Sequence, residues 1–283
     1  MKVLVQTLIS RVSPVAALLL LAPLASQAQG KMSFGARLGG NLSKSTINLL
    51  SDVGQVSTPN LSFDYTQSYV LGAQGGVVLN MQWGQWAFQP ALLFSQKGVK
   101  QKLDLTVQDD GFRISGDVSI TTRVNYLELP LLAVYSTGSE GTGFQVFAGP
   151  YLAVGVGGQN TNDLKVAVSD PSNPKDSFTF SQNKAVELTF GDEFTEPNNN
   201  AGGGGIDGLL DTSILDTFAT TRRFDAGVTA GIGYRTGPVQ VQLGYSLGLL
   251  NTQPSYPANF GLDSEKSYNR AVQLSATFFF GPK

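Results

Sequence analysis

The stretch LNMQWGQWAFQP, residues 79–90, contains both tryptophans of the chain, one on each side of a Gly-Gln pair. A two-residue hairpin turn with glycine at its first central position would place Trp83 opposite Trp86 and Met81 opposite Phe88. Because side chains alternate between the two faces of a strand, one face of this hairpin is bulky and apolar. The other face carries small or amide residues. The stretch therefore predicts two antiparallel strands whose faces meet different surroundings.

The same alternation recurs in eight segments of the chain, and no stretch of comparable length has helical periodicity. The predicted fold class is therefore all-β. The connections between segments alternate in length: short at 84–85, 136–142 and 236–238, and long at 44–68, 101–116, 157–221 and 251–267. Short turns at one end and long loops at the other are typical of bacterial outer-membrane barrels.

The bulky faces predict which side of the barrel wall meets lipid. The interior of an eight-stranded barrel is barely wide enough for side chains, so Trp, Phe and Leu from every strand would overfill it. Turned outward, these residues meet lipid, and the Gly and Gln faces fit a narrow lumen. The sequence thus predicts an eight-stranded antiparallel up-and-down transmembrane β-barrel with long extracellular loops.

Six aromatic residues fall beside the short connections. They are Trp83, Trp86, Tyr135, Phe144, Tyr234 and Phe280. Amphipathic aromatic rings collect at membrane–water interfaces, so we expect these six to form a girdle at the periplasmic interface.

Four charged residues, Arg37, Lys97, Glu128 and Asp225, lie on polar faces of the predicted strands. An unpaired charge in a narrow interior is costly, so each should find an opposite partner. We expect a structural charge network that plugs the lumen, with Arg37 and Glu128 forming an ion pair near mid-height. The alternative interpretation is that these charges gate ions.

The third and fourth segments extend beyond the length that a membrane requires. Asp110-Gly111 is a strong turn signal. Beyond Lys97 the apolar residues switch to the other face on both segments. This pattern predicts a hairpin outside the membrane that packs its inner face on neighbouring loops. The connection at 157–221 is rich in Asn, Asp and Gly and is predicted to be flexible.

The N-terminal residues predict export. Lys2 and Arg11 precede or flank an apolar run from Val15 to Leu24, and Ser26-Gln27-Ala28 follows as a small-x-small cleavage signal. We therefore expect residues 1–28 to be a cleaved signal peptide and residues 29–283 to form the outer-membrane barrel domain.

The composition excludes several classes of function. The chain has no His and no Cys, which removes Ser-His triads, thiolate catalysis and the commonest zinc ligands. The net charge of −2 argues against nucleic acid as a partner. The glycines at 202–205 lack the context of a phosphate-binding loop, and the acidic residues of 157–221 lack the spacing of a calcium loop. We therefore predict no catalytic residue, cofactor or metal site.

Four motifs resemble the PorT-like outer-membrane β-barrel proteins: GARLGGNLS, PALLFSQKGVK, FAGPYLAVGVGG and, most specifically, NYLELPLL. The resemblance spans essentially the whole mature chain. It implies an eight-stranded barrel in the outer membrane of Gram-negative bacteria, and a founding member of the family is tied to protein secretion and gliding.

From these observations we expect a non-enzymatic outer-membrane protein with an envelope structural or interaction role and a link to protein secretion. Its expected partners are outer-membrane lipid and an envelope or extracellular protein, contacted through loops 44–68, 101–116 and 157–221. The alternative is a small pore for ions or solutes.

Overall fold

The computed structural model describes residues 31–46, 57–58, 60–109, 111–169, 177–193, 219–255 and 266–280. The predicted signal peptide lies outside these residues. The strands are β1 (Lys31–Ser45), β2 (Ser57–Thr58), β3 (Leu61–Trp83), β4 (Trp86–Asp109), β5 (Phe112–Ser136), β6 (Gly143–Ser169), β7 (Phe178–Glu187), β8 (Thr189–Phe190), β9 (Thr220–Thr221), β10 (Phe224–Thr236), β11 (Val239–Gly248) and β12 (Asn269–Phe280). A 3-10 turn, η1 (Ser139–Gly141), joins β5 to β6.

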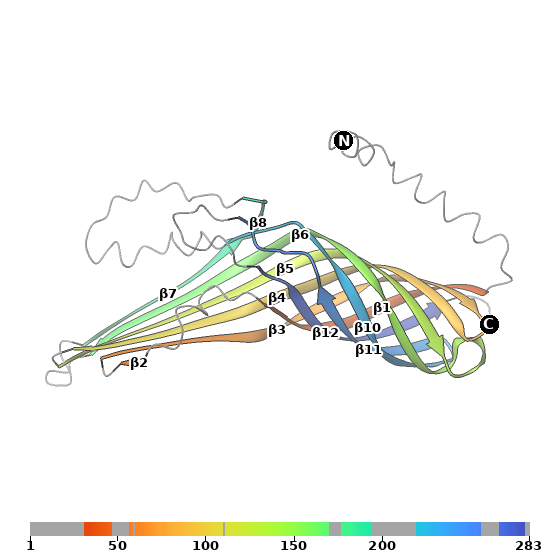
Figure 1. Ribbon diagram of the computed structural model, residues 1–283, viewed down its shortest axis with the longest axis horizontal. Coiled ribbons are helices and arrows are strands. Elements are labelled where there is room, and N and C mark those ends of the chain that lie inside the picture. Colours follow the sequence, from red (N-terminus) through yellow and green to blue (C-terminus); the bar gives the residue numbers. More distant parts are fainter. Residues whose placement is uncertain are drawn as a thin grey trace.

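Eight of the described strands close into a ring. The order is β1-β12-β11-β10-β6-β5-β4-β3, every neighbouring pair is antiparallel, and β1 pairs with both β12 and β3. The prediction of an all-β, eight-stranded antiparallel up-and-down barrel is therefore confirmed. Figure 1 shows this barrel at the right. No helix within the described residues has the length and apolar character needed to cross a membrane.

The hairpin at residues 79–90 has the predicted register. Trp83 pairs with Trp86 and Met81 pairs with Phe88. Gly84 has a φ of 58°, as the first central position of a type II′ turn requires. Residues other than glycine rarely adopt such a positive φ. The turn therefore sets which residues of β3 and β4 share a face.

The barrel wall has an apolar outer surface and a polar inner surface. Leu38 is 73% exposed and Phe34 is 64% exposed, whereas Asn41 and Gln240 are completely buried. Leaving so much apolar surface in water would cost about 25 cal/mol for each Å², so the outer surface is suited to lipid. Gly149 lets neighbouring strands approach closely, because an added Cβ would lie 2.0 Å from the carbonyl oxygen of Leu131.

Four strands of the barrel continue far beyond it. Strands β3 to β6 have 23 to 27 residues, whereas β1, β10, β11 and β12 have 10 to 15. A spanning strand needs about 9 to 11 residues, so the long strands project roughly 40 Å past the barrel. Strand β7 pairs with β6 in this projection, and β2 pairs with the end of β3. We call the five-stranded projection of β3 to β7 the arm, which extends to the left in Figure 1.

The arm corrects the predicted loops. The connection at 101–116 is not an irregular loop but the hairpin that the Asp110-Gly111 signal predicted, because β4 and β5 run through it and Asp109 pairs with Phe112. In the connection expected at 157–221, β6 continues to Ser169 and β7 returns beside it. The run at 196–208, predicted to be flexible, lies outside the described residues. The hairpin beyond the barrel is confirmed, but its neighbours on both sides are strands where loops were expected, because β3 pairs with β4, β6 pairs with β5 and β7 pairs with β6.

The two faces of the arm differ in polarity. Leu105 pairs with Phe63 on one side and Gly116 on the other, and Leu103 pairs with Tyr65 and Val118. Alternate residues of β4 share a face with Lys97, which is buried in the lumen, so the apolar face of the arm continues the inner side of the barrel. We call it the inner face. Its apolar members include Leu61, Phe63, Tyr65, Leu103, Leu105, Val107, Ile114, Val118, Ile120, Leu164, Val166, Val168, Phe178 and Phe180.

Candidate functional site

The lumen beside the short turns is filled by amide side chains that bond to one another. Gln89 Nε2 donates to Asn80 Oδ1 at 2.9 Å, and Gln240 Nε2 donates to Gln145 Oε1 at 2.8 Å. Gln89 and Gln240 face each other at 3.3 Å. All four are almost completely buried, so this layer joins opposite walls of the barrel through side chains alone.

A charged cluster lies further from the short turns. Lys97 Nζ is 2.7 Å from Glu128 Oε2 and 3.8 Å from Asp225 Oδ2, and none of the three residues is more than 1% exposed. Asp225 Oδ2 also accepts hydrogen bonds from the hydroxyl of Tyr151 at 3.1 Å and from Asn269 Nδ2 at 2.9 Å. The ammonium of Lys97 lies 4.3 Å from the ring centre of Tyr151. We call these five residues the lumen cluster.

Arg37 belongs to a different part of the lumen, which corrects the expected ion pair. Its Nε donates to Thr277 Oγ1 at 2.9 Å and its Nη2 donates to Gln242 Oε1 at 2.7 Å. Among the described residues Arg37 forms no ion pair, and Lys97 takes the place opposite Glu128 that was expected for Arg37. Arg37 and Glu128 lie at similar distances along their strands from the short turns. Strands of a barrel are tilted and staggered, so equal counts do not bring side chains together.

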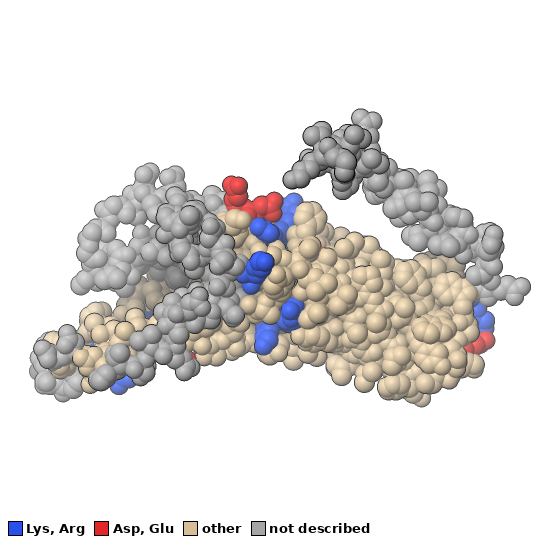
Figure 2. Space-filling model, viewed as in Figure 1, with Lys and Arg blue, Asp and Glu red and all other residues tan. Residues whose placement is uncertain are grey.

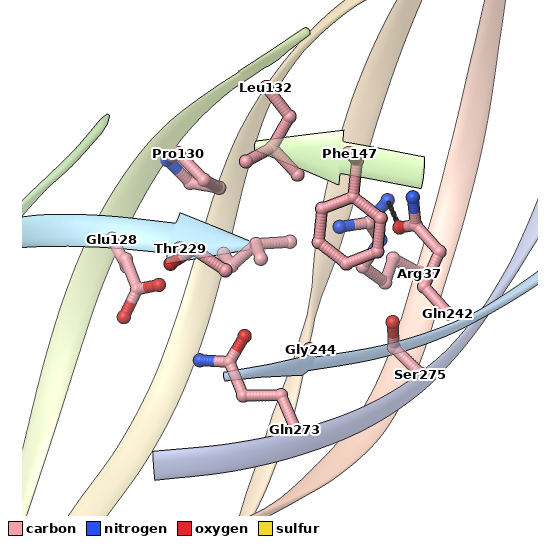
Figure 3. A pocket seen from close by; sticks show the side chains of 11 residues that line it. Arg37, Glu128, Pro130, Leu132, Phe147, Thr229, Gln242, Gly244, Gln273 and Ser275 are labelled. Atoms are coloured by element: carbon pink, nitrogen blue, oxygen red, sulfur yellow. Dashed lines mark hydrogen bonds between the residues drawn. The ribbon is translucent and has the colours of Figure 1, made fainter. Parts of the chain in front are cut away.

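A small cavity separates Arg37 from the lumen cluster, and Figure 3 shows the side chains that line it. Water molecules could place their centres in about 20 Å³ of this space, which is room for about one water. The lining mixes polar groups, including Gln242 and Gln273, with Leu132 and Phe147.

Apolar residues close the lumen on the side of the arm. Leu188 follows β7, Ala219 precedes β9, and both are buried against Val124, Tyr126 and Tyr151. No pattern in the sequence predicted this closure, because these residues fall within the connection that was expected to be a loop. The lumen cluster thus lies between an amide layer and an apolar layer.

The predicted aromatic girdle lies on the outer surface beside the short turns. Five of its members are 41% to 58% exposed, namely Trp83, Trp86, Phe144, Tyr234 and Phe280, and Tyr135 is half-buried. Trp86 and Tyr135 have ring centres 5.1 Å apart, and Tyr234 pairs with Phe144 on the neighbouring strand. The arrangement suits a ring of side chains at a membrane interface.

The inner face of the arm is a second candidate site, because large apolar side chains remain exposed on it. Leu105 is 37% exposed, Ile114 is 43% and Phe178 is 53%. Within the described residues, β7 pairs only with β6, so its outer edge presents unpaired backbone groups. Such an edge can accept an added strand.

The opposite, outer face of the arm is polar. Asp104 pairs with Asp64 on β3 and with Asp117 on β5. Desolvation in the sheet, followed by the hydrogen bond with Asp117 and its charge, raises the pKa of Asp104 above its ordinary value. In the part of the chain that the structure describes, no group of acidic side chains has the arrangement of a metal site.

A comparison with protein families identifies the type of domain. A family model described as "Outer membrane protein beta-barrel domain" matches residues 25–253. Among solved structures, Neisserial surface protein A is 10% identical, with 88% of this chain and 99% of that chain covered and a TM-score of 0.30. The translocator domain of the autotransporter NalP from Neisseria meningitidis is 9% identical, with 92% of each chain covered and a TM-score of 0.24. No curated protein matches the chain in sequence.

Proposed function

The chain belongs to the outer membrane protein β-barrel domain family and is therefore an integral protein of the cell outer membrane, and we propose that its barrel anchors the arm so that the arm binds another protein. The partner is a protein of the envelope or of the cell exterior. The resemblance to PorT-like proteins supports a link between this binding and protein secretion. The protein is proposed to act by interaction, without catalysis.

The filled lumen supports an anchoring role over a conducting one. The amide layer around Gln89 and Gln240 and the lumen cluster around Lys97 occupy successive levels of the interior. Small barrels of eight strands are usually filled with side chains in this way. Glu128 and Asp225 are engaged by Lys97, so neither carboxylate is free to act as a general base.

The arm is the observation that carries the proposal. Five strands spaced about 4.8 Å apart, each with about ten residues rising 3.3 Å, give a face of roughly 800 Å². One partner contributes a similar area to a protein interface of standard size. The inner face is apolar over much of this area, and aqueous exposure of such a face is costly unless a partner covers it.

Site-specific crosslinking tests the proposal. A photoreactive amino acid at Leu105 or Ile114, on the inner face, should crosslink a discrete protein in intact cells. The matched control is the same amino acid at Asp104, which lies on the outer face of the same strand as Leu105. Equal crosslinking from both faces, or crosslinking from neither, would contradict a specific inner-face interaction.

The alternative function is a small pore, and the charged and polar lining of the lumen, including the cavity beside Arg37, supports it. Single-channel recording in planar bilayers distinguishes the two functions. An anchor with a plugged lumen should give no steady openings. Steady openings that change in conductance on Lys97→Gln substitution would favour the pore.

A further inference from the structure

The outer wall of the molecule has an uneven distribution of charge. On the face shown in Figure 2, the barrel surface has no charged side chain between a pair at the far rim and a band of charged side chains where the barrel meets the arm; this band is mostly basic, with acidic side chains at its upper end. At the end of the barrel with the short turns, Lys31 Nζ and Glu140 Oε1 form an exposed ion pair 2.6 Å apart. The basic band therefore marks one boundary of the uncharged wall.

Four cations lie on the outward faces of β1, β4, β5 and β12, beyond the apolar residues on the side of the arm. They are Lys44, Lys100, Arg123 and Arg270. Lys44 follows the exposed Leu42 by two residues on β1, and Arg270 precedes the exposed Val272 by two residues on β12. Because residues two apart on a strand point the same way, these cations continue the lipid-facing rows.

Lys44 and Arg270 are directly opposite each other in the register of β1 and β12. Like charges in this position repel, which destabilises a sheet unless an anion lies between them. Among the described residues neither forms an ion pair with a carboxylate. Arg270 Nη1 is held by the carbonyl oxygens of Gly248 and Asn269, at 2.7 and 3.1 Å.

Two tyrosine rings accompany this pair of cations. Lys44 Nζ lies 5.0 Å from the ring centre of Tyr69, and the guanidinium carbon of Arg270 lies 5.9 Å from that of Tyr268. Tyr69 is 51% exposed. Rings of this kind prefer the headgroup level of a membrane, where one side is apolar and the other is wet.

We propose that Lys44 and Arg270, flanked by Tyr69 and Tyr268, bind the phosphate of a phosphorylated lipid headgroup in the leaflet on the side of the arm. Phosphate accepts strong charge-assisted hydrogen bonds from Lys and Arg and offsets the repulsion between them. The site lies where the apolar wall ends, which is the depth of a lipid headgroup. It goes beyond the proposed binding of a protein by the arm and does not depend on that binding.

The test uses the full chain in detergent, titrated with diphosphorylated lipid A and observed by native mass spectrometry. Each juxtamembrane cation contributes about fivefold to the affinity for an anionic headgroup, so Lys44→Gln/Arg270→Gln should weaken binding about 25-fold. The matched control, Lys102→Gln/Lys165→Gln, removes two exposed cations from the outer face of the arm and should leave the affinity unchanged within about twofold.

Three further measurements decide the source and the role of the phosphate. Fully dephosphorylated lipid A should bind about as weakly as the double variant does. Inorganic phosphate at the same concentration should not displace lipid A, and full displacement would overturn the lipid assignment in favour of a free-phosphate site. Lys44→Arg/Arg270→Lys keeps both charges and should retain binding, so it tests the proposal even where the Gln variants fail to fold. Unchanged affinity in correctly folded Gln variants would also overturn it.

Discussion

Strands β3 to β6 pass through two regions, the barrel and the arm, and carry opposite polarity in each. In the barrel, Leu71 and Leu92 lie on the outer surface and Gln74 lies inside. In the arm, Leu105 lies on the inner face and Asp104 on the outer face. β3 carries one extra residue between Tyr69 and Gln74, and β6 carries one between Gly155 and Gly157. These bulges change which residues of β3 and β6 point inward. On β4 the same alternate residues, including Lys97 and Leu105, stay on the inner side, and the sequence itself changes from polar to apolar.

The difference shows that the surrounding medium, lipid or water, determines which face of the strands is apolar. Inside a membrane, the outside of a barrel is the apolar environment and the polar groups must satisfy one another within. Beyond the membrane, water surrounds the outer face of the arm, so the apolar residues collect on the inner face. The lumen cluster keeps polar groups away from lipid, and the inner face of the arm gathers apolar groups away from the water on the outer face.

Neutralising Glu128 should lower the free energy of unfolding of the barrel more than the other substitutions do. Glu128→Gln leaves Lys97 without its nearest counter-charge in a site that is 1% exposed. Loss of one member of a buried ion pair costs about 3 to 5 kcal/mol. Guanidinium unfolding of the protein in micelles should show this loss, whereas Glu140→Gln, which disrupts an exposed pair, should cost less than about 1 kcal/mol. Equal losses in the two variants would show that the lumen cluster does not stabilise the barrel.

Arginine substitutions compare the surroundings of two exposed leucines. Leu38→Arg places a charge near the middle of the uncharged wall and should destabilise the barrel by about 2 to 4 kcal/mol. Leu105→Arg meets water in the arm and should leave the unfolding of the barrel within about 0.5 kcal/mol of the parent. The same substitution should abolish crosslinking to the proposed partner. A similar loss of barrel stability in both variants would mean that the two surfaces share one environment.

Removing the hydroxyl of Tyr151 is a milder change within the lumen cluster. Tyr151→Phe deletes one donor to Asp225 while Lys97 and Asn269 remain. The expected loss is about 1 to 2 kcal/mol in the same unfolding measurement. The neighbouring Tyr126→Phe is the control, because Tyr126 accepts a longer contact of 3.4 Å from Asn269 and should lose less. A larger loss for Tyr126→Phe would indicate that Asp225 is not the centre of the cluster.

The closed barrel, the register of its hairpins and its apolar outer wall could be predicted from the alternation of residues. Each of these features depends on which residues follow one another along a strand. The pairing of Trp83 with Trp86 and the exposure of five of the six girdle aromatics followed from that pattern alone. The partner of Glu128 did not, because it depends on strand tilt across the barrel. The closure by Leu188 and Ala219 also escaped prediction, since nothing in a connecting segment indicates which residue reaches the lumen.

The smallest expected effect concerns the outer face of the arm, where Asp104 has a raised pKa because of desolvation and then the hydrogen bond and charge of Asp117. A carboxyl whose folded pKa is raised binds its proton more tightly in the folded arm. The arm should therefore become more stable as the pH falls from 7 through that raised pKa, and the gain should be complete below the ordinary value of 3.8. Hydrogen exchange of β3 to β5 at several pH values measures this dependence.

Asp104→Asn should slow exchange of the arm at pH 7, because it removes repulsion between like charges that face each other across the strands. It should also flatten the pH dependence between pH 7 and 4. The barrel amides provide an internal control, since the substitution lies outside the membrane and should leave their exchange unchanged. If Asp104→Asn instead left the arm with the same pH dependence as the parent, the dependence would belong to other carboxyls, and the polar face would be held together independently of Asp104.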